Sequence, residues 1–151
     1  MSGPEDKKIF VLVAEDDEDD SLLIREALAE NGLNWELHYV TDGLELMDYL
    51  RRCANRDQPG APPFPDLILL DLNMPRKDGR ETLREISANP LFRNIPIAVL
   101  TTSSEPDDVR LCRSLGAGTF FTKPSAYSEW VEKMGAVRKI MPDILFSTPV
   151  K

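Results

Sequence analysis

A run of four aliphatic residues near the middle of the chain constrains the fold most. Residues 67–70 read Leu-Ile-Leu-Leu and follow Pro65 and Asp66. The run is too short for a helix that buries one face, but it suits a strand covered on both sides in a parallel sheet. Asp71 follows directly, and Pro75 ends the strand region because proline cannot donate to a neighbouring strand. On this segment alone, Asp71 is equally well explained as a loop residue that starts a turn or as a functional acid at a strand end.

Two other apolar runs and two shorter patterns indicate four more strands. Residues 9–14 and 95–100 are apolar throughout, which again suits buried strands. Residues 35–40 alternate between apolar and polar side chains, so this strand should have one wetter face and lie nearer the edge of the sheet. Residues 119–122 form a short last run that ends at Lys123.

A helical pattern follows each predicted strand. The patterns end at Asn31-Gly32 for the first helix and cover residues 42–54, 80–88, 106–115 and 125–141 for the others. Strand and helix therefore alternate five times, which predicts a parallel α/β sheet with helices on both faces. The flavodoxin-like strand order 2-1-3-4-5 is the simplest topology for five strands joined by right-handed crossovers.

Local signals indicate where two of these helices begin. Asp42 and Glu45 resemble a capping pair, in which each side chain satisfies a free backbone N–H of the first turn. Ser103 or Ser104 should cap the helix that carries Pro106 in its first turn.

The length predicts one domain. A chain of 151 residues is of the commonest domain size, and we expect a domain over residues 7–141 with an N-terminal extension (1–6) and a C-terminal tail (142–151). Residues 55–65 contain four prolines and a glycine, and we expect them to form a loop at the amino edge of the sheet.

The composition excludes several classes of function. A net charge of −8 argues against nucleic-acid binding, which needs a basic surface. The chain lacks both the ~20 apolar residues that a membrane span needs and the apolar core of a secretion signal. Cys53 and Cys112 have no metal-binding spacing, which favours a reducing cytoplasm. His38, the single histidine, is expected to be a surface or half-buried strand residue.

Charged and hydroxyl side chains follow four of the predicted strands. They are Glu15 and Asp16 after the first, Asp71 after the third, Thr101 at the end of the fourth and Lys123 after the fifth. In the order 2-1-3-4-5 these strands are neighbours, so the side chains should form one acidic pocket around Asp71. The acids at 17–20 are explained by a helix start, because negative charge there favours the positive end of the helix dipole.

The chemistry of such a pocket favours phosphoryl transfer. Crowded carboxylates attract Mg²⁺, which would neutralise charge on an incoming phosphoryl group. Asp71 could attack phosphorus and form an aspartyl phosphate. Thr101 could bind one phosphoryl oxygen, and Lys123 could pair with another.

The chain resembles the receiver domains of two-component response regulators over roughly residues 7–140. The matching motifs are Glu15-Asp16, Asp71 within Asp-Leu-Asn-Met-Pro, Thr101, and Lys123-Pro124. The resemblance implies that Asp71 is the phosphoacceptor, with at most slow self-catalysed transfer and dephosphorylation. It also implies four Mg²⁺ ligands, which are the side chains of Glu15, Asp16 and Asp71 and the backbone carbonyl of Asn73. The implied switch residues are the Thr101 hydroxyl and the Phe120 ring. Lys123 would sense the phosphoryl group, and the Lys123–Pro124 peptide bond would be cis.

A narrower resemblance concerns the partner. The Pro-rich insertion, the Lys-Pro-Ser start of the last helix and the lack of an output domain resemble stand-alone regulators paired with bacterial phytochrome kinases. The expected partner is therefore a histidine kinase, with a bacteriophytochrome as the narrower expectation. We also expect a homodimer through the 106–115 helix, strand 119–122 and the 125–141 helix, where mixed acids and bases suit an isologous contact.

Three other classes share parts of this pattern. A haloacid-dehalogenase-type phosphatase uses a second aspartate two residues after the nucleophile, but Asn73 stands there and cannot act as an acid or base. A flavodoxin would need phosphate donors after the first strand, where six acids stand instead. A purely structural binding domain is the third alternative, and Mg²⁺ titration would distinguish it.

Overall fold

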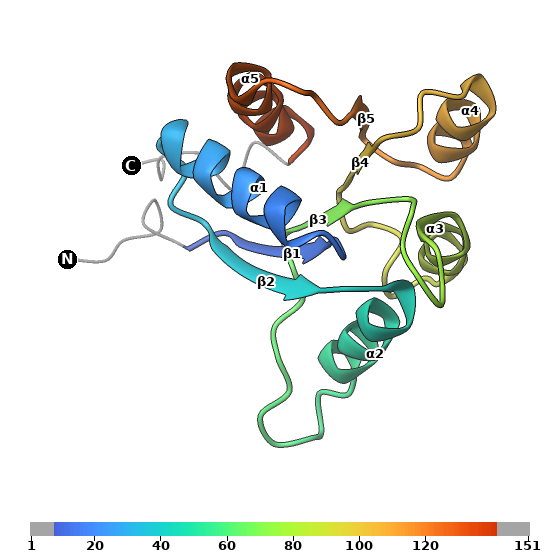
Figure 1. The fold of residues 1–151 in the computed structure, drawn as a ribbon. Helices are drawn as coiled ribbons and strands as arrows, with labels where there is room; N and C mark the ends of the chain where they lie inside the picture. Colours follow the sequence, from blue (N-terminus) through green and yellow to red (C-terminus); the bar gives the residue numbers. More distant parts are fainter. Residues whose placement is uncertain (1–7, 142–151) are drawn as a thin grey trace, which may run out of the picture.

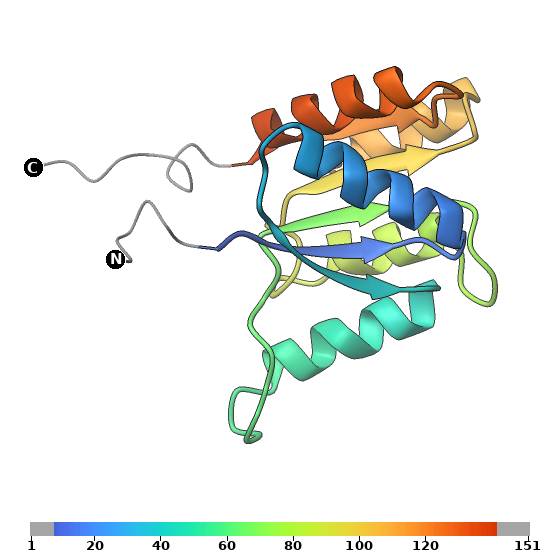
Figure 2. The ribbon, with the colours of Figure 1, turned by 60° about the vertical axis from the view of Figure 1, so that its left-hand side comes forward.

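Five parallel strands form one sheet in the order β2-β1-β3-β4-β5. The computed structural model describes residues 8–141. The strand bounds are β1 Phe10–Ala14, β2 Glu36–Val40, β3 Leu67–Leu70, β4 Ile97–Thr101 and β5 Thr119–Thr122. The predicted flavodoxin-like topology is therefore confirmed, and the carboxyl ends of the strands point to one side of the molecule (Figure 2).

Helices cover both faces of this sheet (Figure 1). Their bounds are α1 Glu18–Glu30, α2 Gly43–Ala54, α3 Gly79–Ala88, α4 Pro106–Ser114 and α5 Tyr127–Val137, followed by the 3-10 turn η2 Arg138–Ile140. Helices α1 and α5 pack side by side on one face, and α2, α3 and α4 lie on the other. Within the described range 8–141, each helix falls well short of the length and apolarity that a membrane span requires.

Two hydrophobic cores, one on each face, hold the layers together. Leu67 and Leu69 of β3 belong to the core under α1 and α5, while Ile68 and Leu70 belong to the core under the other helices. All four side chains are buried, as the uninterrupted apolar run predicts. Burying one such side chain stabilises the fold by about 1.5–3 kcal/mol, so β3 is held firmly in the sheet directly before Asp71.

Strand β2 lies at one edge of the sheet, as the alternating pattern of residues 35–40 predicts. It pairs with β1 on one side, and most of its side chains are exposed or half-buried. His38 is exposed and stacks against Tyr49 of α2, with 4.8 Å between ring centroids. The single histidine is therefore a surface packing residue, as expected.

The Pro-rich loop lies at the amino ends of the strands, away from Asp71 (Figure 2). The Arg56 guanidinium closes it by donating to the carbonyl oxygens of Pro62, at 2.8 Å, and Cys53, at 3.2 Å. The chain then enters the sheet at Asp66, whose N–H donates to the carbonyl of Phe10 at 2.7 Å.

Two local expectations about α4 and β5 are wrong. Helix α4 begins after Glu105, which makes no side-chain cap hydrogen bond. Ser103 lies two residues before Glu105, and its hydroxyl accepts from the Glu105 N–H at 3.3 Å and donates to Asp108. The Lys123–Pro124 peptide bond is trans, as are all peptide bonds in the part of the chain that the structure describes. Trans is the ordinary preference of an X–Pro bond by ~0.5–1 kcal/mol, and the trans bond still delivers Lys123 to the pocket.

The last helix is shorter than predicted. It begins at Tyr127 rather than Ser125 and gives way to η2 after Val137. Trp130 and Met134 are buried as expected, but Tyr127 is exposed at the first turn. The tail at 142–151 and the extension at 1–6 lie outside the described residues.

Candidate functional site

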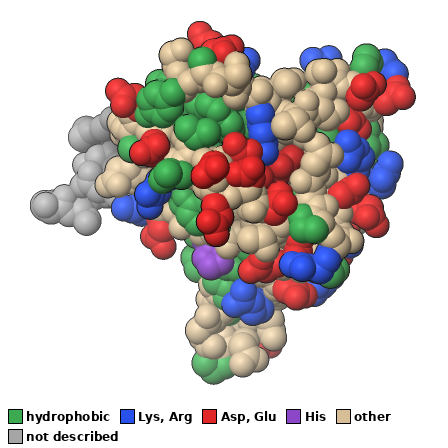
Figure 3. All heavy atoms as spheres, viewed as in Figure 1, with side chains coloured by type: hydrophobic (Ala, Val, Ile, Leu, Met, Phe, Trp, Pro, Cys, Tyr) green, Lys and Arg blue, Asp and Glu red, His purple; other side chains and the backbone are tan. Residues whose placement is uncertain are grey.

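The side chains predicted to converge do meet at the carboxyl ends of β1, β3, β4 and β5. Glu15, Asp71 and Thr101 are buried, with exposed fractions of 3%, 4% and 0%. Asp16 is exposed at the mouth of the pocket. Acidic side chains gather near the centre of the face seen in Figure 3, where the amino-terminal turn of α1 lies.

Three carboxylates form a group that fits one divalent cation. Glu15, Asp16 and Asp71 each offer an oxygen, and these oxygens lie within 4.8 Å of one another. Oxygens on opposite sides of one Mg²⁺ are ~4.2 Å apart, so small side-chain adjustments would bring all three onto one ion. Hard carboxylate oxygens are also the ligands that Mg²⁺ prefers, and the donor set therefore fits the predicted metal.

Lys123 lies inside the same group of acids. Its ammonium nitrogen is 2.7 Å from Glu15 Oε1, 2.9 Å from Asp71 Oδ2 and 2.7 Å from Asp20 Oδ2. Burial alone would lower the pKa of Lys123, but the hydrogen bonds to Asp20, Glu15 and Asp71 outweigh burial and raise the pKa. Lys123 therefore stays charged and is the cation of the pocket.

The Glu15 carboxyl is held in an unfavourable environment for its negative charge. Burial raises its pKa most, the hydrogen bond from Lys123 opposes this rise, and the nearby Asp71 carboxylate adds to it. A divalent cation would relieve the same penalty, because it supplies the positive charge that the buried acids lack.

Asp71 is fixed through its backbone. Its N–H donates to the carbonyl of Ala14 at 3.0 Å, which ties the end of β3 to β1. Helix α3 begins directly behind it at Gly79, where an added Cβ would lie 2.3 Å from the Asp71 carbonyl oxygen. Glycine is therefore required at this close approach, and Asp71 cannot retreat from the pocket.

Asn73 links Asp71 to the hydroxyl end of the site. Its backbone N–H donates to Asp71 Oδ1 at 3.0 Å, and its amide donates to Thr101 Oγ1 at 3.1 Å and Thr102 Oγ1 at 3.2 Å. The resemblance to receiver domains implied a role for the Asn73 carbonyl, but the contact of its side chain with Thr101 was missed. An amide two residues after Asp71 was the available signal.

Phe120 is half-buried on the α4 side of β5, where it packs against the core under α2, α3 and α4. The adjacent Phe121 faces α5, and Lys133 lies over its ring at 5.5 Å. The predicted switch aromatic therefore borders α4, whereas its neighbour borders α5.

Asp20 is a residue of the pocket that the sequence did not reveal, because its carboxylate contacts Lys123. It belongs to the six acids assigned to a helix start, and Asp17 does cap α1 by accepting from the N–H groups of Asp19 and Asp20. The missed signal is helical spacing, because Asp20 falls on the same side of α1 as the buried Ile24 and Ala27.

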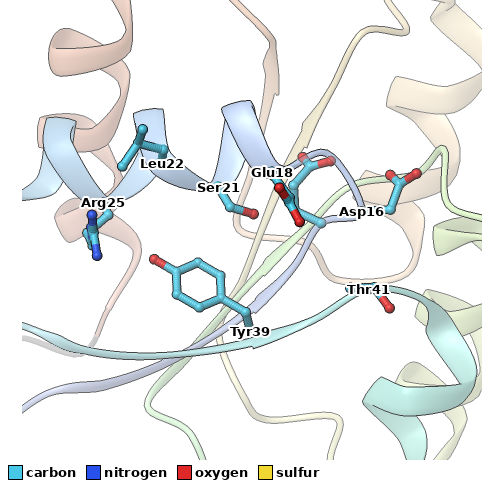
Figure 4. Close-up of a pocket in the computed structure, with 8 residues that line it drawn as sticks. Asp16, Glu18, Ser21, Leu22, Arg25, Tyr39 and Thr41 are labelled. Carbon is cyan, nitrogen blue, oxygen red and sulfur yellow. The ribbon is translucent and has the colours of Figure 1, made fainter.

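A groove between α1 and β2 leads to the exposed acids (Figure 4). Asp16 and Glu18 stand at one end of the groove and Arg25 at the other, and the hydroxyl of Tyr39 points toward Arg25. The groove therefore ends beside Glu15 and Asp16, two of the three carboxylates of the group.

Comparison with known proteins agrees with this geometry. The family profile described as "Response regulator receiver domain" matches residues 11–134. The chain is 41% identical over 123 residues to the response regulator Rcp1 of Synechocystis sp., covering 82% of each chain.

Solved structures give the same result. The phosphorylated cyanobacterial phytochrome response regulator RcpA is 36% identical with a TM-score of 0.77, covering 89% of this chain and 94% of that one. The Mn²⁺-bound form of Rcp1 is 37% identical with a TM-score of 0.75, covering 87% and 92%. The chain therefore belongs to the response regulator receiver-domain family.

Proposed function

We propose that this response regulator accepts a phosphoryl group on Asp71 from the phosphohistidine of a histidine kinase. The observation that carries this proposal is the buried Asp71 carboxylate held between Lys123 and the acids Glu15 and Asp16. A buried carboxylate with a fixed backbone and an adjacent cation is suited to attack phosphorus and to hold the product.

The transfer exchanges one bond to phosphorus for another. An Asp71 carboxylate oxygen forms the new O–P bond, while the N–P bond of phosphohistidine breaks and its electron pair returns to the imidazole. Lys123 already lies 2.9 Å from Asp71 and pairs with a phosphoryl oxygen, and the Thr101 hydroxyl donates to another. The transfer therefore needs no side chain to act as a general acid or base.

Mg²⁺ is the proposed cofactor. The residues that would hold it are Glu15, Asp16, Asp71 and the backbone carbonyl of Asn73. When bound, the ion supplies positive charge against the negative charge on the transferring group. The Mn²⁺-bound structure of Rcp1 supports a divalent cation in a receiver domain of this kind.

A bacteriophytochrome is the proposed kinase. The support is that RcpA is described as a phytochrome response regulator and that a response regulator in red light signalling of R. palustris is 31% identical, with a TM-score of 0.77 and 95% of this chain covered. We place the protein in the cytoplasm, where its two buried free thiols, Cys53 and Cys112, would stay reduced. Any self-catalysed transfer and dephosphorylation would be slow.

The haloacid-dehalogenase alternative is not favoured. That mechanism needs an acid two residues after the nucleophile, and the Asn73 amide is instead engaged as a donor to Thr101 and Thr102.

Output is proposed to occur through a homodimer formed by α4, β5 and α5. Phe120 borders α4 on this face, so movement of Thr101 toward a phosphoryl group would reach α4 through β5. Arg113 of α4 and Glu132 of α5 are exposed there and have the opposite charges that an isologous contact uses.

Acetyl phosphate tests the acceptor directly. With Mg²⁺, the intact mass of the protein should increase by one phosphoryl group, and the group should be lost in base or hydroxylamine. Asp71→Asn should abolish the increase, whereas Asp17→Asn should keep it because Asp17 caps α1. Labelling that survives Asp71→Asn would reassign the acceptor.

A further inference from the structure

Asp20 makes a long-range contact that the proposed transfer does not use. Its carboxylate, from the first turn of α1, accepts from the Lys123 ammonium at 2.7 Å across 103 positions of sequence. The side chain is 21% exposed, so the pair is largely shielded from water. Asp17 fixes this turn by accepting from the Asp20 N–H at 3.1 Å, which directs Asp20 toward the pocket.

The ammonium group and a divalent cation would share two carboxylate partners. Lys123 contacts Glu15 and Asp71, and both acids belong to the group of three that fits a metal ion. Asp20 lies outside that group. When a cation takes Glu15 and Asp71, Asp20 is therefore the contacting acid that still faces Lys123.

An ammonium group left without a partner here would be costly. The Lys123 side chain is 8% exposed, and a buried charge that loses its hydrogen-bonded partners destabilises the state that contains it. Metal entry is easier when one partner remains, because the lysine then moves from three carboxylates to one instead of to none.

We propose that Asp20 is a positioning residue for Lys123. It holds the ammonium group beside the pocket when a divalent cation occupies Glu15 and Asp71, and from there Lys123 passes to the phosphoryl group. The second half of this inference rests on the proposed phosphorylation of Asp71, whereas the first half concerns metal binding alone.

Mg²⁺ affinity, measured by calorimetric titration without any phosphodonor, tests the first half. Asp20→Asn should weaken Mg²⁺ binding roughly tenfold, the effect of one hydrogen bond to a charged group. Asp19→Asn is the matched control, because it removes an equal charge from the same turn at an exposed position. It should weaken binding less than about threefold, as expected for a screened surface charge.

A double substitution separates an effect through Lys123 from a direct effect of charge. In a Lys123→Gln background, Asp20→Asn should cost no more Mg²⁺ affinity than Asp19→Asn does. Equal losses for the Asp20 and Asp19 variants in the wild-type background would overturn the proposal. So would an Asp20→Asn loss that persists at full size after Lys123→Gln.

Acetyl phosphate labelling tests the second half. In Asp20→Asn, the Mg²⁺ concentration for half-maximal labelling should rise by the same factor as the dissociation constant, and the rate at saturating Mg²⁺ should fall several-fold below wild type because Lys123 is no longer held beside the phosphoryl group. A saturated rate equal to that of wild type would overturn the second half. Failure of the wild type to be labelled would refute the proposed function, and the titrations would still decide whether Asp20 positions Lys123.

Discussion

At the scale of single residues, the pocket is a site with excess negative charge that one ammonium group partly neutralises. Glu15 and Asp71 are buried on either side of Lys123, and Asp16 stands exposed at the mouth. A divalent cation would therefore stabilise this arrangement, because it supplies the positive charge that the buried acids lack. In the proposed transfer, the same excess of charge would repel the incoming phosphoryl group until cations screen it.

Mg²⁺ should therefore raise the melting temperature. At a hundredfold excess over its dissociation constant, a ligand of the folded state stabilises it by about 2.7 kcal/mol, or roughly 5–10 °C for a chain of this size. Asp16→Asn should remove most of the rise, because it removes one of three carboxylate ligands. Asp57→Asn, exposed in the Pro-rich loop, is the control and should respond as wild type does. An undiminished response in Asp16→Asn would rule out the proposed ligand set.

The residues of the site differ in how far the sequence could reveal them. Glu15, Asp71 and Lys123 follow apolar runs, and parallel strands carry such positions to one edge of the sheet. Asp20 was hidden because its neighbours are also acids, and a helix start explains them all equally well. Its role depends on a contact with Lys123 across 103 positions, and no local pattern reports such a distance.

At the scale of elements, α4 is fastened to α3 by a charged pair. Arg80 of α3 donates twice to Asp108 of α4, with both distances 2.7 Å, and the Ser103 hydroxyl also donates to Asp108. The hydrogen bonds from Arg80 and then Ser103 lower the pKa of Asp108 to about 2. Because Ser103 lies two residues after Thr101, this pair joins the pocket to the position of α4.

The pair should make stability depend on acid. A carboxyl with a lowered pKa in the folded state stabilises the fold above its unfolded pKa, and this contribution is lost as the pH falls through the folded pKa. Asp108→Asn should therefore cost about 2 kcal/mol of unfolding free energy at pH 7 and roughly half of that near pH 3. Urea denaturation at several pH values measures the difference.

Asp107→Asn is the control for this measurement. Asp107 lies one position away and pairs with Arg110 on the surface, so its loss should cost under ~1 kcal/mol at every pH. A cost for Asp108→Asn that is the same at pH 7 and pH 3 would contradict an ionic origin.

The Pro-rich loop should be separable from the chemistry. Residues 57–61 lie between Arg56 and Pro62, whose hydrogen bond closes the loop at the amino edge of the sheet. Deleting these five residues should leave labelling by acetyl phosphate and the response to Mg²⁺ unchanged, because Asp71 lies at the opposite edge. A deletion variant with a native circular dichroism spectrum but no labelling would contradict this separation.

Element boundaries show where sequence reasoning reaches its limit. The strands were predicted because uninterrupted apolar runs have few alternatives once both faces are covered. The start of α4 was not, because the helix follows Glu105 rather than either serine. Asp108 of α4 is held by the Ser103 hydroxyl and by Arg80 of α3, so its position depends on how α3 packs. That position is a property of the packed fold.

At the scale of the whole molecule, the alternation of strand and helix predicted the topology. Right-handed crossovers and short connections leave few arrangements of five strands, and β2-β1-β3-β4-β5 is the one observed. Assembly is harder to predict, because the charges on α4 and α5 can pair within the chain or between chains. Asp108 is already paired with Arg80, and Arg110 with Asp107, which leaves Arg113 and the acids of α5 for a partner.

The proposed homodimer should therefore be sensitive to charge on α4. Light scattering should detect a dimer whose strength changes when a beryllium fluoride mimic of the phosphoryl group is added. Changing Arg110 and Arg113 to Glu should leave a monomer under both conditions, because like charges then face each other across the interface. Changing Arg51 and Arg52 of α2 to Glu is the control and should leave dimerisation intact. A monomer in every case, or a dimer indifferent to the α4 reversal, would exclude this interface.

Borohydride trapping decides whether Asp71 carries the phosphoryl group. Borohydride reduces an aspartyl phosphate to homoserine, so peptide mass spectrometry after treatment with acetyl phosphate and Mg²⁺ reveals which aspartate was phosphorylated. We predict homoserine at position 71, and its loss when Mg²⁺ is replaced by a chelator. Homoserine at position 16, 17 or 20 with none at 71, or no homoserine in the presence of Mg²⁺, would refute Asp71 as the acceptor.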